Sequence, residues 1–223
     1  MKYFDTEKIV IKSWCNTPEE GCIEQAKHLA NLPFAYRQVA LMPDTHAGFG
    51  MPIGGVLATK NVVVPNAVGA DIGCGMVFVK TNILVDSIKG VKTTEGVPLL
   101  KAIIGNIRKV VPVGFDKHKE KQESPIFNIA PSIDVIVEEL DNAMYSLGTL
   151  GGGNHFIELQ KDEEGYLCLM LHSGSRNFGK KIADVYNKKA KSINETYFVS
   201  VPKEWDLAFL PVDSPEGKEY IEA

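Results

Sequence analysis

Two residues that could bind a metal ion lie three positions apart in a glycine-rich segment of this 223-residue chain. Asp71 supplies a carboxylate and Cys74 a thiol within the run VGADIGCGMVF, residues 68–78. Glycine lets the backbone adopt conformations, or approach other groups, in ways that other residues cannot. The three glycines of this run therefore predict a site that needs room close to the backbone.

Three further segments combine a glycine-rich turn with polar side chains of similar types. They are PDTHAG with Asp44 and His46, LGGGNHF with Asn154 and His155, and LHSGSR with His172 and Arg176. Like the first segment, each lies where a short apolar run meets a turn. If the corresponding strands are neighbours, the turns meet at one end of a sheet, where α/β-type proteins often place their sites.

A thiolate, two imidazoles and a carboxylate together suit a divalent cation. Cys and His favour a borderline ion such as zinc, while Asp admits a harder ion such as Mn²⁺. The glycines before Asn154 offer backbone N–H groups that could bind an anion such as phosphate. Arg176 adds a planar pair of donors for phosphate oxygens. These groups together indicate a phosphorylated substrate.

Each of these residues also has a purely structural interpretation. Cys74 could be a small buried apolar side chain, His46 could cap a turn, and His155 and His172 could be hydrogen-bonded core histidines. These interpretations weaken in combination, because four coincidences would have to fall in the same kind of turn. The other thiols and imidazoles lack this context, and we expect structural roles for them: Cys15, Cys22, Cys168, His28 and His118.

Composition narrows the class of protein. Hydrophobic residues at 44% and charged residues at 23% are typical of a globular chain, and a net charge of −4 argues against broad, non-specific nucleic-acid binding. The four cysteines have neither disulfide-framework nor zinc-finger spacing, so we expect reduced thiols. No apolar run approaches the roughly 20 residues of a membrane span, and the charged start has no secretory signal. We expect a cytoplasmic protein with no membrane contact.

Apolar periodicity predicts the elements that position these residues, in an α+β (irregular α/β) fold with mixed sheets flanked by helices. We expect one domain over residues 1–223. Predicted helices cover residues 19–32, 98–111, 132–148 and 180–191, and a further helix begins within 213–223. Predicted strands cover residues 36–42, 53–59, 61–65, 76–82, 155–160 and 166–173.

The helix expected over 180–191 carries lysines on its outer side. Such a face is usually only solvated, and otherwise it could hold an RNA backbone through its charge. The lysines are Lys180, Lys181, Lys188 and Lys191. No run of the sequence interleaves aromatic and basic residues as a stacking platform for bases would.

Taken in order, PDTHAGFGMPIG, AVGADIGCGM, LGTLGGGNHFIEL and LHSGSRNFG resemble the RtcB family of RNA ligases. The resemblance covers essentially the whole chain and implies an RtcB-like fold. It also implies a GTP- and Mn²⁺-dependent enzyme that acts in tRNA splicing or RNA repair. Such an enzyme joins RNA ending in a 3′-phosphate or 2′,3′-cyclic phosphate to RNA with a 5′-hydroxyl, through a guanylylated histidine.

The resemblance implies metal ligands at four positions of this sequence. Asp71 and Cys74 would bind Mn²⁺, with Cys74 shared between two ions, and His155 and His172 would complete the first ion.

It also implies roles for three residues outside the metal ligands. Asn154 would contact the GTP phosphates, Arg176 would hold an RNA phosphate, and Asp44 would help to orient the nucleotidyl histidine. The role of His46 stays open.

One part of the family pattern is missing. In the family, a further metal-binding histidine and the nucleotidyl histidine lie near the C-terminus, the latter in a His-Gly-Ala-Gly-Arg motif, but no histidine follows His172 here. We therefore expect a truncated, N-terminal portion of such an enzyme that does not ligate RNA alone. The implied partner is RNA, the need for an archease-type activator stays open, and we expect a monomer.

Two other functions fit the same residues. A metal-dependent phosphoesterase would use Asp71, Cys74, His155 and His172 to hydrolyse a phosphate ester without GTP. A non-catalytic remnant would bind RNA or a nucleotide without turnover.

Overall fold

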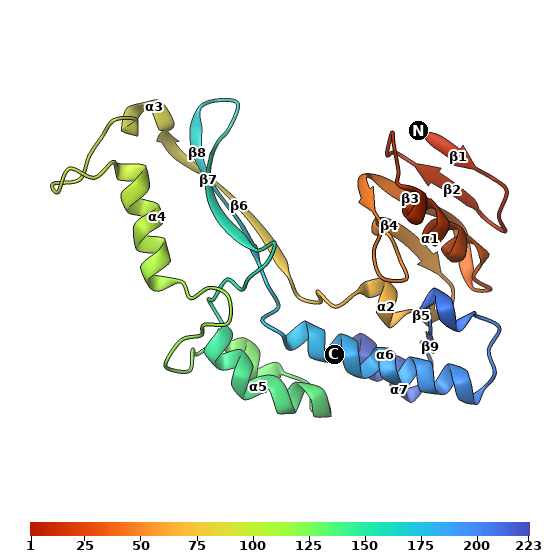
Figure 1. The fold of residues 1–223 in the computed structure, drawn as a ribbon. Helices are drawn as coiled ribbons and strands as arrows, with labels where there is room; N and C mark the ends of the chain where they lie inside the picture. The colour runs from red at the N-terminus through yellow and green to blue at the C-terminus, as the bar shows by residue number, and fades with distance from the viewer. The chain divides into compact units, whose positions relative to one another are not determined.

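The chain folds into two units, which we describe in a computed structural model of residues 1–223 (Figure 1). The first unit comprises Met1–Ala70 and Lys181–Ala223, and the second comprises Asp71–Lys180. Helices and strands are mixed along the sequence, and the strands form three separate sheets. This confirms the α+β class. That residues 1–223 act as one domain stays a prediction.

A four-stranded sheet with the order β1-β2-β3-β4 organises the first unit. Its strands are β1 (Lys2–Phe4), β2 (Val10–Ser13), β3 (Ala35–His46) and β4 (Ile53–Thr59). β2 and β3 pair in parallel, and the connection between them is helix α1 (Glu20–Asn31). The other two pairs are antiparallel.

Helix α1 packs on one face of this sheet and builds the core (Figure 1). Its buried residues recur at helical spacing, which is what an amphipathic helix needs in order to cover a sheet; they are Cys22, Ala26, Leu29 and Ala30. Opposite them, Ile11, Val39 and Leu41 point inward at alternate strand positions and are fully buried. The helix ends before Pro33, because the residue that precedes a proline avoids the helical conformation.

The rest of the first unit is made of short elements and one long helix. They are β5 (Val62–Val63), α2 (Pro65–Val68), η2 (Lys203–Trp205), β9 (Leu210–Pro211), α7 (Pro215–Glu222) and α6 (Phe178–Thr196), whose residues from Lys181 onward belong to this unit. β5 and β9 form a two-stranded antiparallel sheet. None of the helices combines the length and the apolar character that crossing a bilayer requires.

The second unit is built on a three-stranded antiparallel sheet with the order β6-β8-β7. The strands are β6 (Gly75–Leu84), β7 (Phe156–Lys161) and β8 (Tyr166–Ser173). Between β6 and β7 the chain forms α3 (Val85–Ile88), α4 (Leu99–Val110), η1 (Pro125–Ile129) and α5 (Asp134–Ser146).

Most of the predicted elements are present, and the exceptions have local causes. The four helices expected from apolar periodicity are α1, α4, α5 and α6, although α6 is longer at both ends. The strand expected over 61–65 stops at Val63, because Pro65 suits the first position of a helix and α2 begins there. β1 and β2 were not predicted, since they are only 3 and 4 residues long. All four cysteines are free thiols, as expected.

Candidate metal centre

Strand register brings three of the four polar turns to one end of the β6-β8-β7 sheet. β8 is the central strand, and His172 near its end lies opposite Met76 on one side and Phe156 on the other. Cys74 precedes β6 and His155 precedes β7 by one residue each. Because both outer strands run antiparallel to β8, their first residues meet its last ones. The sheet therefore flanks His172 with Cys74 and His155.

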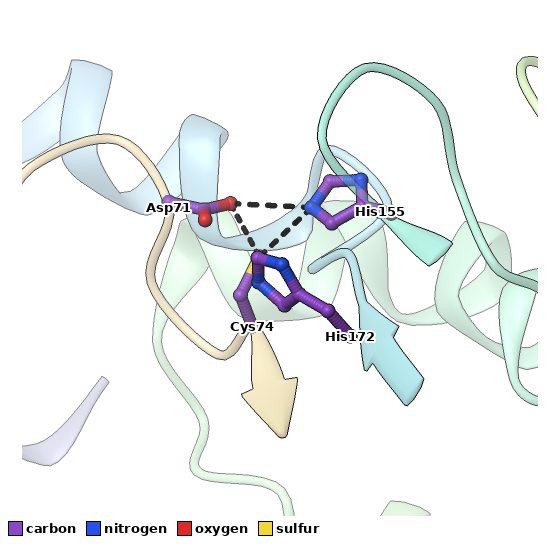
Figure 2. A group of neighbouring side chains, drawn as sticks. All are labelled: Asp71, Cys74, His155 and His172. Atoms are coloured by element: carbon purple, nitrogen blue, oxygen red, sulfur yellow. Dashed lines mark hydrogen bonds and ion pairs between the residues drawn. The ribbon is translucent and has the colours of Figure 1, made fainter. Parts of the chain in front are cut away.

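The side chains of Asp71, Cys74, His155 and His172 point toward one another at this sheet end (Figure 2). Their potential ligand atoms all lie within 4.8 Å of one another. His155 Nε2 is 3.5 Å from Cys74 Sγ and 3.9 Å from Asp71 Oδ1. The Cys74 thiol donates a short hydrogen bond to the same Asp71 oxygen. This spacing is compatible with four ligands around one cation.

The His155 ring is fixed by packing more than by hydrogen bonds. Its side chain is only 14% exposed, and Nδ1 is buried with no hydrogen-bond partner. The His172 ring meets it edge-on, with 4.9 Å between centroids and 74° between planes. A neutral imidazole carries its hydrogen on one nitrogen only, so a proton on Nδ1 leaves the Nε2 lone pair directed at Cys74 and Asp71.

Two kinds of glycine shape this site. Gly73, between Asp71 and Cys74, has a φ of +84°, a conformation that residues with side chains rarely adopt. Gly174 serves a different purpose, because a Cβ atom there would lie 2.7 to 3.1 Å from three atoms of the His155 ring. The close-approach glycine therefore lies in LHSGSR, beyond the run that first indicated the site. Gly174 follows His172 in the same motif, which was the signal available in the sequence, but the sequence analysis did not single out this glycine.

Electrostatics in the protein alone favour a neutral thiol. Burial, together with the hydrogen bond to the Asp71 carboxylate, raises the pKa of Cys74 to about 11. A bound cation reverses this preference, because its charge stabilises the thiolate directly. A thiolate, two imidazoles and one carboxylate form a donor set for a borderline divalent ion. The residues present thus fit such an ion by donor chemistry and by spacing.

The glycine loop before His155 leaves backbone donors open. Gly151 and Gly153 have φ values of +97° and +73°. The amides of Gly152, Gly153 and Asn154 donate no hydrogen bond within the chain, and Asn154 is exposed. Successive free amides of this kind can bind an anion. The structure therefore leaves the loop next to His155 available for a phosphate.

Arg176 is engaged with the protein itself. Its Nε donates to the Thr149 hydroxyl at 2.7 Å, and its two terminal nitrogens donate to the carbonyls of Gly114 and Asp116 at 2.6 and 2.9 Å. Arg176 and His155 both lie against Gly151. The guanidinium thus ties the 114–116 and 149–151 segments together beside the cluster, and its role toward an RNA phosphate stays a prediction.

Asp44 and His46 lie in the first unit, at the end of β3. Asp44 is exposed, and its backbone carbonyl is 3.0 Å from His46 Nδ1. Between them, the buried Thr45 hydroxyl donates to the Ile53 carbonyl at 2.8 Å. The cluster of four does not include Asp44, and a catalytic role for Asp44 stays a prediction.

The thiols and imidazoles for which structural roles were expected stand outside this cluster. Cys22 is buried, with its sulfur 3.3 Å from the Thr45 hydroxyl, and Cys168 is buried in β8. The His28 ring stacks on Trp205 at 4.6 Å.

Comparison with known proteins gives the family of the chain. A family model described as "tRNA-splicing ligase RtcB" matches residues 25–139 and 131–223. The chain belongs to the RtcB family. Two RtcB proteins show the degree of sequence similarity. The "RNA-splicing ligase RtcB" of Escherichia coli K12 is 32% identical over 237 residues, which covers 97% of this chain and 55% of that protein. The "tRNA-splicing ligase RtcB" of Thermococcus kodakarensis is 28% identical over 254 residues, covering 92% and 51%.

The matches cover only part of each RtcB relative. The chain spans about half the length of the curated RtcB proteins it matches. All four residues of the metal cluster lie within the segments that the RtcB family model matches.

Proposed function

We propose that this chain provides a metal- and nucleotide-binding part of an RtcB-type RNA ligase. The proposed reaction uses GTP and Mn²⁺ to join RNA with a 3′-phosphate or 2′,3′-cyclic phosphate to RNA with a 5′-hydroxyl. The observation that carries the proposal is the convergence of Asp71, Cys74, His155 and His172 at one sheet end. Family membership supplies the class of reaction.

The four clustered side chains would hold the ion, with Cys74 shared between two ions in the complete site. Bound Mn²⁺ supplies positive charge that stabilises the phosphate oxygens during phosphoryl transfer. Cys74 gives up its proton on binding, so that its sulfur faces the ion as a thiolate. Packing against Gly174 keeps the His155 ring in the orientation that presents Nε2.

The open amides of the glycine loop and the exposed Asn154 would bind the GTP phosphates next to His155. Arg176 would direct its remaining N–H groups to an RNA phosphate, since three of its five are used within the chain. Asp44 would help to orient the histidine that becomes guanylylated. These roles, like a place in tRNA splicing or RNA repair, an archease-type activator, a monomeric state and a cytoplasmic location, stay predictions.

Calorimetric titration with Mn²⁺ tests the metal site directly. We expect the wild-type chain to bind Mn²⁺ and Cys74→Ala to bind it at least about 10-fold more weakly, since even changes outside the ligand set cost 10- to 100-fold. Cys15→Ala is the matched control, because Cys15 is a free thiol outside the cluster. Equal Mn²⁺ affinity in wild type and Cys74→Ala would refute the proposed site.

RNA joining tests the reaction class. Residues 1–223 would replace the matching half of the Escherichia coli relative, and the chimera would be given GTP, Mn²⁺ and the two RNA ends. Sealed product that is lost in Cys74→Ala and retained in Cys15→Ala supports the ligase. Release of phosphate without GTP, abolished by Cys74→Ala, would instead assign a metal-dependent phosphoesterase.

A further inference from the structure

The β1–β4 sheet of the first unit has one face covered by α1 and one face that carries exposed aromatic rings. Strand alternation separates the two, because Ile11, Val39 and Leu41 point toward α1 while their neighbours in sequence point away. We call the side opposite α1 the open face; five residues on or beside it, Tyr3, Lys12, Trp14, Tyr36 and Arg37, form the basis of this inference.

Strand register, rather than sequence proximity, gathers these residues. Tyr3 on β1 lies opposite Lys12 on β2, and Lys12 lies opposite Ala40 on β3. Trp14 follows Ser13, whose buried side chain points toward α1, and the Trp14 amide donates to the Leu41 carbonyl at 2.8 Å. Continued alternation therefore directs the Trp14 indole to the open face.

The third ring reaches the open face through an irregularity in β3. Tyr36 pairs with Ala58 on β4, and the register shifts between Tyr36 and Val39. Ala58 is two residues from Val56, which belongs to the Tyr3–Lys12–Ala40 row, so Tyr36 points to the same side. The bulge holds Arg37 at a φ of +64°, an unfavourable conformation for a residue with a long side chain.

All three rings are accessible to a ligand. Tyr3 is 58% exposed, Tyr36 48% and Trp14 43%. Trp is highly buried on average and Tyr is intermediate in burial. The three rings therefore offer exposed aromatic surface on one side of the sheet.

Positive charge accompanies the rings. Lys12 Nζ lies 6.0 Å from the centre of the Tyr3 ring, and Arg37 Cζ lies 5.3 Å from the centre of the Tyr36 ring. Within the four strands, Asp44 at the end of β3 is the only acidic residue. Lys12 and Arg37 therefore place two positive charges beside the rings, on a chain whose net charge is −4.

We propose that the open face binds single-stranded RNA, with bases stacked on Tyr3, Trp14 and Tyr36 and phosphates paired with Lys12 and Arg37. Proteins that bind single strands combine this pairing of aromatic rings and cations, and rings on a β-sheet surface stack bases that are not in a duplex. Single-stranded ends are what a ligase must hold, and in choosing RNA as the ligand the inference rests on the proposed function. Lys12 and Arg37 beside the rings complement the negative charge of a phosphate backbone.

The test is a titration of a short fluorescein-labelled oligouridylate with the 223-residue chain at low salt, followed by fluorescence anisotropy. EDTA is present throughout, so a failure of the metal proposal cannot alter the result. We expect Tyr36→Ala and Trp14→Ala each to weaken binding about 5-fold or more, the range for loss of one stacked base. Tyr36→Phe and Trp14→Phe retain a ring and should bind within about 2-fold of wild type.

Tyr197→Ala is the matched control, because Tyr197 is 75% exposed in the same unit but lies at the end of α6 rather than on the sheet. Circular dichroism of every variant separates lost stacking from lost folding, and the phenylalanine variants provide a second reading if an alanine variant unfolds. The inference is overturned if the wild type does not bind, or if Tyr197→Ala weakens binding as much as Tyr36→Ala. It is likewise overturned if the sheet variants change only the sedimentation of the protein, which would make the open face a protein interface.

Discussion

The imidazole of His155 is positioned by close packing against two glycines, which leave room for the ring because they carry no side chain. Gly151 and Gly174 lie against the ring. The Nδ1 atom of the ring is buried and has no hydrogen-bond partner. Rings of metal-binding histidines are commonly held by a hydrogen bond from the second nitrogen. In the proposed metal site close packing takes that part, so the site should be sensitive to very small changes in side-chain volume.

Gly174→Ala adds one methyl group at that contact. The new Cβ would lie within 2.7 Å of the ring, so we expect His155 to turn away from Cys74 and the Mn²⁺ affinity to fall about 10- to 100-fold, as for other groups that orient ligands. Calorimetric titration with Mn²⁺ measures the change. Gly105→Ala is the control, because Gly105 lies in α4 with nothing near its Cβ position. Unchanged affinity in Gly174→Ala would show that the ring does not need this space.

At the scale of elements, Arg176 connects the end of β8 to two other segments of the second unit. Arg176→Lys keeps the charge but cannot reach the Thr149 hydroxyl and both carbonyls at once. We expect the free energy of unfolding to fall by about 2 kcal/mol, the scale of a lost hydrogen bond from a charged group. Urea denaturation gives the value.

The control for this change is Arg108→Lys, since Arg108 is an exposed residue in the last turn of α4. It should alter stability only slightly. A stability equal to wild type in Arg176→Lys would mean that the guanidinium contacts are replaceable and that the arginine is retained for another purpose.

Sequence reasoning succeeded where one element carries its own signal and failed where separate elements have to be aligned. The spacing of Cys22, Ala26 and Leu29 predicts α1, and ligand-type residues at turns predict that strand ends meet. The open face was missed because Tyr3, Trp14 and Tyr36 are distant in sequence and come together only through strand register and a bulge. Register depends on pairing across the sheet, which a single strand does not encode.

At the scale of the whole chain, all four proposed metal ligands belong to the second unit. Mn²⁺ that binds only the folded site stabilises it by about 2.7 kcal/mol at 100 times its dissociation constant. We expect hydrogen exchange to slow in β6, β7 and β8 when Mn²⁺ is added, while amides of β1 to β4 exchange at their original rate. Mass spectrometry of peptides from both units measures this. Equal slowing in both units would contradict a site confined to residues 71–180.

The order of the ligands along the chain also has a consequence for synthesis. A ribosome produces Asp71 and Cys74 well before His155 and His172, and α3, α4 and α5 are made in between. Until β8 has emerged and paired with β6, Cys74 is an isolated thiol with no imidazole beside it. The proposed site would therefore gain its complete ligand set for a divalent ion only late in synthesis. In the proposed site, the choice of ion would then depend on the finished sheet, because the thiol alone lacks the two imidazoles that complete the ligand set.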